Sequence, residues 1–281
     1  TGSLGNMSIG ADLNLSRSSH LGVLPARFAA HTEVNGSVFV SNCSRLSNLQ
    51  TSAFQGLSVF GGSVVLTLNP RIATIETRAF GGLKIVDVGR LRFDGSVVRR
   101  VNSRGFVDIH VLSPHDNQQA TLSLRGVHLR EIGEACFDGL IAGGLDLSMN
   151  AVSHVPAGAF GMVNLSSALN LTGSGVTTFD PWAFAGLRAL EMLLESNMLE
   201  VMPPFGFGNL SVPSASAIRL HGNPLKRLES DAFAQIVLEN LVNGGGVASG
   251  GELNLAGLDV ETIKPFAFRG LQVARLVLAD N

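Results

Sequence analysis

Apolar and polar residues follow a unit that recurs along the whole chain every 23 to 26 residues in most places. Each unit begins with an apolar-x-apolar triplet such as Leu145-Asp146-Leu147, turns at a polar residue three positions later, and ends with a phenylalanine. Residues two apart in a strand point to the same side, so each triplet predicts a short strand with both apolar side chains in a core. A period in the twenties is typical of stacked solenoids, whose neighbouring repeats bury one another.

The phenylalanines give the clearest count of the units. Two steps between them are longer than the rest, at 31 and 35 residues. A further triplet at Leu276-Val277-Leu278, with Asn281, opens a new unit, which makes ten units and the start of an eleventh. We expect the rings to fill one side of the core and to stack edge on edge. They are Phe28, Phe54, Phe80, Phe106, Phe137, Phe160, Phe184, Phe207, Phe233 and Phe268.

The polar residue after each triplet sits where the chain turns. A buried amide must be satisfied, and stacked turns let it bond the backbone of the neighbouring unit, which predicts an asparagine ladder. Val127 and Leu258 cannot contribute, so the ladder should be interrupted there. The members expected to bond fully are Asn69, Asn150, Asn197, Asn223 and Asn281, those bonding in part are Ser18, Ser96 and Ser174, and Cys43 is a usual substitute.

The pattern L-x-L-x-x-N-x-L-x-x-I-x-x-x-A-F-x-G-L resembles the leucine-rich repeat, and its Phe-x-Gly-Leu ending resembles the extracellular class of that family. The segment 132–140 (IGEACFDGL) also resembles the BspA-like variant of bacteria and protists. The resemblance covers the chain from about residue 10 to 281. It implies one α/β solenoid over 1–281, dominated by strands and curved into a horseshoe with a parallel sheet on its concave side. It also implies a role in binding or adhesion, and it brings no catalytic residues.

Secreted members of that family usually close both ends with cysteine-rich caps, and this sequence has neither. Three explanations are open. The chain is a segment of a longer protein, or its ends stack head to tail in a fibre, or its termini form polar caps of their own. An uncapped solenoid exposes apolar core and an edge strand, which favours association.

The two long steps locate insertions, at 107–120 and 234–252. Both follow a phenylalanine and precede the next strand, so we expect them to project from the convex side or the rim. Five glycines make the second insertion flexible. Insertions at one place in a repeat array are often functional, although tolerated surface loops are the simpler interpretation.

Composition excludes several classes of protein. The chain is 45% hydrophobic and 15% charged, which is unlike a disordered segment. Its 20 Lys and Arg against 22 Asp and Glu argue against nucleic acid, which requires a basic surface. No apolar run is long enough to span a membrane.

The sequence also carries more N-glycosylation sequons than the roughly two or three expected by chance. The excess favours a secreted or cell-surface glycoprotein of a eukaryote, although a repeat rich in Asn and Ser also produces sequons. Two of them lie at outward positions of predicted strands. The sequons start at Asn6, Asn14, Asn35, Asn42, Asn164, Asn170 and Asn209.

The two cysteines, Cys43 and Cys136, lie three units apart, which is roughly 15 Å along a stack of strands. A disulfide cannot span that distance, so both are predicted to be buried thiols.

No motif for catalysis, a metal or a cofactor is found. The histidines lack metal-binding spacing, and His110 and His115 with Asp116 are better interpreted as solvated loop residues than as metal ligands. We therefore expect no enzyme activity and no cofactor.

The middle residues of the triplets should face outward from the concave sheet. This row has a mixed character, with few aromatic residues, and a merely solvated face is an alternative to a binding surface. Arg92, Arg125, Asp146 and Arg219 are the candidates for contacts with a protein or glycan ligand. A structural role as a filament, wall or matrix subunit is the alternative function. The row is Asn14, Phe39, Thr67, Arg92, Ser123, Asp146, Asn170, Leu193, Arg219, Asn254 and Val277.

Overall fold

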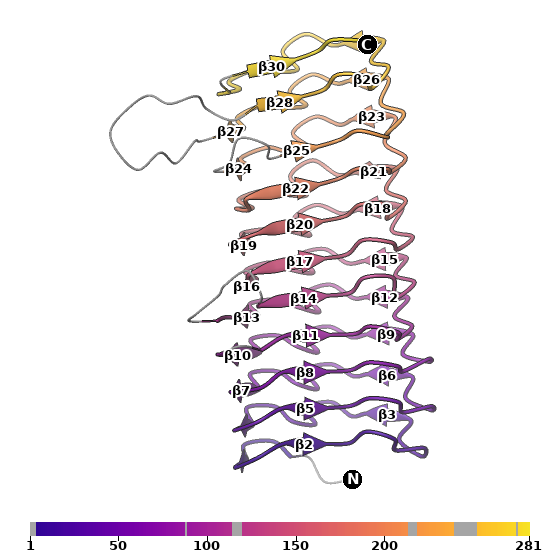
Figure 1. Cartoon of the computed structure of the whole chain (residues 1–281), viewed down its shortest axis with the longest axis vertical. Coiled ribbons are helices and arrows are strands. Elements are labelled where there is room, and N and C mark those ends of the chain that lie inside the picture. Colours follow the sequence, from indigo (N-terminus) through magenta and orange to yellow (C-terminus); the bar gives the residue numbers. More distant parts are fainter. Residues whose placement is uncertain (1–3, 88, 114–119, 213–217, 239–251, 274) are drawn as a thin grey trace, which may run out of the picture.

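The structure, a computed structural model, describes residues 4–87, 89–113, 120–212, 218–238, 252–273 and 275–281. Within them the chain winds into a column of stacked turns whose strands form parallel sheets along three sides (Figure 1). The predicted solenoid is therefore confirmed. The expected helical component of an α/β horseshoe is absent from the described residues, which contain no helix.

The first side is one continuous sheet, here called the long sheet, which has eleven strands in the described part of the chain. It is built from the apolar triplets, and neighbouring strands come from successive units. Its strands are β2 (Leu13–Asn14), β5 (Val38–Phe39), β8 (Val64–Val65), β11 (Leu91–Arg92), β14 (Thr121–Ser123), β17 (Gly144–Asp146), β20 (Ala168–Asn170), β22 (Glu191–Leu193), β25 (Ile218–Arg219), β28 (Glu252–Asn254) and β30 (Arg275–Val277).

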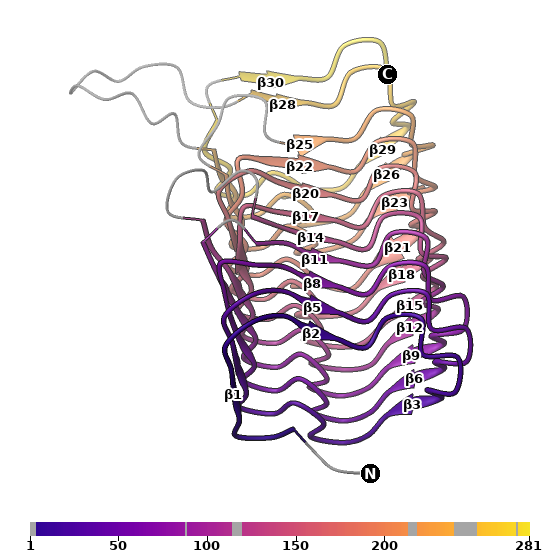
Figure 2. The ribbon, with the colours of Figure 1, turned by 60° about the horizontal axis from the view of Figure 1, so that its bottom comes forward.

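The second side, called the second sheet, follows the polar turn in each unit and lies beside the long sheet (Figure 2). It is divided into three sections. These are β3 (Val23–Leu24), β6 (Asn48–Leu49), β9 (Thr74–Ile75), β12 (Arg100–Val101) and β15 (Glu131–Ile132); then β18 (His154–Val155) and β21 (Thr178–Phe179); then β23 (Val201–Met202), β26 (Arg227–Leu228) and β29 (Thr262–Ile263).

The third side, called the third sheet, follows the phenylalanine of each unit and leads back to the long sheet. Its strands are β1 (Ser8–Ile9), β4 (Glu33–Val34), β7 (Ser58–Phe60), β10 (Lys84–Val86), β13 (His110–Val111), β16 (Ile141–Ala142) and β19 (Asn164–Leu165), with a separate pair β24 (Ser211–Val212) and β27 (Val237–Leu238).

Local sequence explains why strands replace helices. The second sheet is rich in β-branched residues, as in Thr74-Ile75 and Thr262-Ile263, which suit strands. Corners with positive φ interrupt the chain on both sides of these strands, as Leu68 and Arg78 do around β9, and no helix can continue through them. Horseshoe curvature needs one side wider than the other. Here the strand spacing of about 4.8 Å applies on every side, so the turns stack as a column (Figure 1).

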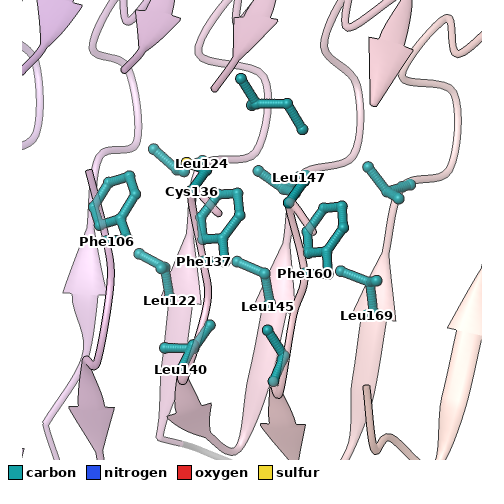
Figure 3. Packing of buried hydrophobic residues seen from close by; sticks show 14 of the residues in the cluster. Phe106, Leu122, Leu124, Cys136, Phe137, Leu140, Leu145, Leu147, Phe160 and Leu169 are labelled. Atoms are coloured by element: carbon teal, nitrogen blue, oxygen red, sulfur yellow. The ribbon is translucent and has the colours of Figure 1, made fainter. Parts of the chain in front are cut away.

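The core is a single apolar cluster that runs along the column between the three sheets. Figure 3 shows Phe106, Phe137 and Phe160 as successive rings beside the leucines of the long sheet. From Phe54 to Phe268 the centroids of neighbouring rings lie 5.2 to 5.7 Å apart. Most of these pairs are stacked face to face, so the predicted edge-on packing is wrong for this phenylalanine stack. Strand spacing alone brings equivalent rings within stacking distance.

The first phenylalanine does not belong to that stack. The amide of Ala29 donates to the carbonyl of Ala53, whereas the amide of Phe54 donates to that of Ala79, so Ala29 and Phe54 are equivalent. Phe28 is only partly buried, and its ring meets the Phe54 ring edge-on at 6.2 Å.

The asparagine ladder is confirmed. The Asn197 side chain donates to the carbonyls of Leu194 in its own turn and Leu171 in the preceding turn, both at 2.9 Å. Its Oδ1 accepts the amide proton of Val176 in the preceding turn at 3.1 Å. Each asparagine of this kind therefore joins two turns through three hydrogen bonds.

The predicted interruption at Val127 is also confirmed. Val127 is fully buried, and its main-chain carbonyl accepts the Val98 amide at 2.8 Å. The backbone thus satisfies the donor that an asparagine side chain takes elsewhere. Leu258 likewise places a buried apolar side chain at the ladder position.

One strand is assigned differently from the prediction. Val65 pairs with Phe39 and Arg92, so it holds the outward position that the sequence pattern gave to Thr67. Leu68 instead lies on a corner with φ of 58° and is 60% exposed. The reason is that ladder residues follow the last buried residue of the strand by three positions, which here is Leu66 before Asn69.

The two predicted insertions begin with regular structure. β13 lies within 107–120 and β27 within 234–252, and both pair in the third sheet. Both strands lie in the first part of their insertion, and 114–119 and 239–251 lie outside the described residues. No helix in the described ranges is long and apolar enough to cross a membrane.

Candidate functional site

The outward row of the long sheet brings two of the four predicted contact residues into one region. Arg92 pairs with Ser123, Ser123 with Asp146, and Asp146 with Asn170, on four successive turns. Arg219 belongs to the same row but lies two strands beyond Asn170.

Each predicted arginine already has an acidic neighbour. Arg92 Nε lies 2.7 Å from Asp94 Oδ2, which is two residues further along the chain. Arg219 contacts Glu191 at 2.9 Å and Glu195 at 3.8 Å. All of these side chains are partly solvent-exposed, so the pairs fix side-chain orientation more than they stabilise the fold.

Arg125 and Asp146 form the third charged group. Their side chains approach to 4.0 Å, and Arg125 Nη1 donates to Ser148 Oγ at 3.1 Å. Asp146 Oδ1 accepts from both the amide and the hydroxyl of Ser148, at 2.9 and 2.6 Å. The carboxylate is thereby held in one orientation on the outer face of β17.

Between the Arg92–Asp94 pair and Asp146 lies a hollow of about 330 Å³ on the long sheet. Its lining includes the small residues Gly144, which is buried, and Ala168, which is partly exposed. Arg92 and Asp94 border one side, and Asp146 and Asn170 border the other. The remaining lining residues are Arg90, Thr121, Ser123, Leu145 and Ser167. This hollow combines hydroxyl, amide, carboxylate and guanidinium groups, which suits a polar ligand.

Three of the lining residues that were not predicted share a position that the sequence could have shown. Thr121, Gly144 and Ala168 come directly before the first apolar residue of their strands. Outward positions recur every second residue, so each strand presents this residue as well as the middle one. Small residues at three consecutive units of this row predict a depression.

The predicted glycosylation sites have surface positions. Asn6, Asn14, Asn35, Asn42, Asn164 and Asn209 are exposed, and Asn170 is half-buried. Asn14 and Asn170 each accept, through Oδ1, the amide proton of the sequon's Ser or Thr, at 2.9 and 3.0 Å. An N-glycan is attached through the amide nitrogen, which these bonds do not use. A glycan on Asn170 would stand at the border of the hollow.

The other reactive groups lie away from this face. Cys43 and Cys136 are free and buried, as predicted, and burial raises the pKa of the Cys136 thiol strongly. No three His, Cys, Asp or Glu side chains gather into a metal-binding group in the described part of the chain, and His115 and Asp116 lie outside it.

Asp138 lies near a second acidic residue on the preceding turn, Asp108. Partial burial, and then the nearby Asp108 carboxylate, raise the pKa of Asp138, and Arg104 opposes this shift.

On the second sheet, a 2.6 Å contact joins Arg100 Nε and Glu131 Oε2. This hydrogen bond lowers the pKa of Glu131 and raises that of Arg100.

The chain matches no family model, no curated protein and no solved structure.

Proposed function

We propose that this chain is a non-enzymatic recognition module that acts outside the cell or on its surface and binds a protein or glycan. We further propose that it is a helix-free variant of the leucine-rich repeat. The repeat pattern of triplet, ladder asparagine and Phe-x-Gly-Leu ending supports this kinship.

The observation that carries the proposal is the hollow on the long sheet. A continuous sheet of parallel strands holds outward side chains in fixed rows, and the middle turns carry small polar residues between charged ones. Because the strands already fix these side chains, a ligand can bind without a rearrangement of the backbone. It offers oriented donors and acceptors at Arg92, Asp94 and Asp146, which give a polar ligand its specificity.

The test fills the hollow without touching the core. Ser123→Arg places a long side chain among the lining residues, and Thr178→Arg adds the same charge at an exposed position of the second sheet as the matched control. Wild-type chain is screened against a glycan array and a displayed peptide library. A ligand of the hollow should bind Ser123→Arg at least about tenfold more weakly, a change of 1.4 kcal/mol, and Thr178→Arg as the wild type does.

Ligands that bind both variants equally would refute the assignment of this face. Absence of any ligand, together with long regular fibres by electron microscopy of protein purified from its source, would favour the alternative role as a filament, wall or matrix subunit.

The extracellular location has its own test. Enzymatic release of N-glycans converts each occupied asparagine to aspartate, and peptide mass spectrometry then identifies the sites. We expect occupancy at one or more of the six exposed sequons. Seven unmodified asparagines in protein from its natural source would contradict the proposal of a glycoprotein.

A further inference from the structure

We infer a second binding site, for a neutral carbohydrate, at the corner that carries Trp182. Each turn has a residue with positive φ two positions before its stacked phenylalanine, as at Arg78, Arg104 and Trp182. Trp182 holds that position, with φ of 64°, and 41% of its surface is exposed. Exposing the apolar surface of an indole to water is unfavourable in free energy. The groups around Trp182 therefore indicate its role.

One face of the indole is covered. The Trp182 and Phe205 rings stack with centroids 4.8 Å apart and an interplanar angle of 11°. Phe205 holds the same corner one turn further along, since the Trp182 amide donates to the Phe205 carbonyl. Gly208, in that same turn, lies so close to the indole that an added Cβ would meet Trp182 Cζ3. This contact also holds the ring in place.

No side chain stands at the equivalent corner on the opposite side of the indole. The preceding turn has Gly158 at the equivalent corner, and the Gly158 amide donates to the Trp182 carbonyl. A Cβ built on Gly158 would have no atom within 4 Å, so nothing fills the space beside this residue. Other turns place arginine here, at Arg27, Arg78 and Arg104. The absence of a side chain at one corner therefore leaves a flat apolar surface with room for a ring.

Polar groups border that space. Asp180 Oδ2 accepts the amide proton of Ala157, the neighbour of Gly158, at 3.2 Å. His154 Nε2 lies 3.3 Å from the same oxygen, and both side chains are nearly half exposed. Because both contacts use Oδ2, Oδ1 keeps its capacity to accept a hydroxyl proton.

A pyranose ring matches this combination. Its axial C–H groups form an apolar face that packs on the electron-rich face of an indole, while its hydroxyls extend from the edge toward groups such as Asp180 and His154. A purely apolar ligand would leave the carboxylate unused. A quaternary ammonium ion is usually held by a cage of several aromatic rings, and this corner offers one open ring.

The experiment uses the chain's own fluorescence, because Trp182 is the only tryptophan and the sequence has no tyrosine. Cellotriose and chitotriose, whose rings carry axial C–H groups on both faces, are titrated into the protein. Sorbitol, which has hydroxyls but no ring, serves as the control. A saturable change in the Trp182 emission with a trisaccharide, in the millimolar range and without one for sorbitol, is expected.

Gly158→Arg fills the open space while keeping the fluorophore. The backbone tolerates it, because the arginines at equivalent corners have φ of 54° to 60°. We expect at least about tenfold weaker binding, a change of 1.4 kcal/mol. Phe266→Arg is the matched control, since it changes the same corner in a later turn where φ is 65° and 71% of the residue is exposed. It should bind as the wild type does.

Three results would overturn the inference. These are no saturable response to either trisaccharide, an unchanged affinity in Gly158→Arg, and a saturable response to sorbitol equal to that for the trisaccharides. The outcome is separate from that of the hollow on the long sheet, because Ser123→Arg should leave this titration unchanged.

Discussion

Removing one ring from the phenylalanine stack tests the packing of the whole column. Phe160 is fully buried in the middle of the chain, and its ring lies 5.3 Å from both Phe137 and Phe184. Truncation of a buried phenylalanine to alanine costs about 3–5 kcal/mol. Because Phe160→Ala removes two stacked contacts at once, we expect about 4–5 kcal/mol, in the upper part of that range.

The measurement is urea unfolding followed by far-ultraviolet circular dichroism and by the fluorescence of Trp182. Repeat proteins can unfold in parts, so the two transitions have to coincide before a single free energy is derived. Phe28→Ala is the control, because Phe28 is only partly buried and meets Phe54 edge-on. It should cost no more than about 2 kcal/mol. A loss below about 1 kcal/mol for Phe160→Ala, or equal losses for both variants, would refute the stack as a source of stability.

Three further changes test other parts of the fold. Asn197→Ala leaves ladder groups of two turns unsatisfied and should cost about 2–4 kcal/mol in the same unfolding assay; a loss below about 1 kcal/mol would mean that water replaces the side chain. The raised pKa of Asp138 means that the folded state binds its proton more tightly than the unfolded state, so stability falls as pH rises through its titration. Asp138→Asn, which also removes the repulsion from Asp108, should therefore stabilise the fold at pH 7 by less than about 1 kcal/mol, seen as a slightly higher melting temperature. This gain should vanish in acid, and an equal gain at low pH would exclude this cause. Cys43 and Cys136 should be inert to a thiol reagent in the folded protein and react in two equivalents after denaturation without reductant, measured by mass spectrometry; fewer equivalents would show that they are not free thiols.

The sequence predicted most of the local structure of each turn correctly. The triplet strands, the ladder at Asn197, its interruption at Val127 and the two buried thiols follow from residue type and spacing alone. It failed where the spacing slips by one or two residues, at Phe28 and at Thr67. In both places a residue of the expected type lies one or two positions away from the correct one. Only the hydrogen bonds between turns decide which residues of neighbouring turns are paired.

The candidate binding surfaces could be predicted from the sequence only in part. Arg92 and Asp146 were found because outward positions alternate along a strand, and Gly144 could have been found by the same rule. The setting of Trp182 could not, because what matters is the pairing of that indole with Phe205 on one side and Gly158 on the other.

The sequence by itself determined that the chain stacks, with what period, and most of the side chains that enter the core, because these depend on the alternation of apolar and polar residues within each unit. Only the tertiary structure decided that three parallel sheets without a helix enclose the core, and which side chains of different turns become neighbours. The physical reason is that hydrogen bonds between turns set every contact along the column, joining residues more than twenty positions apart.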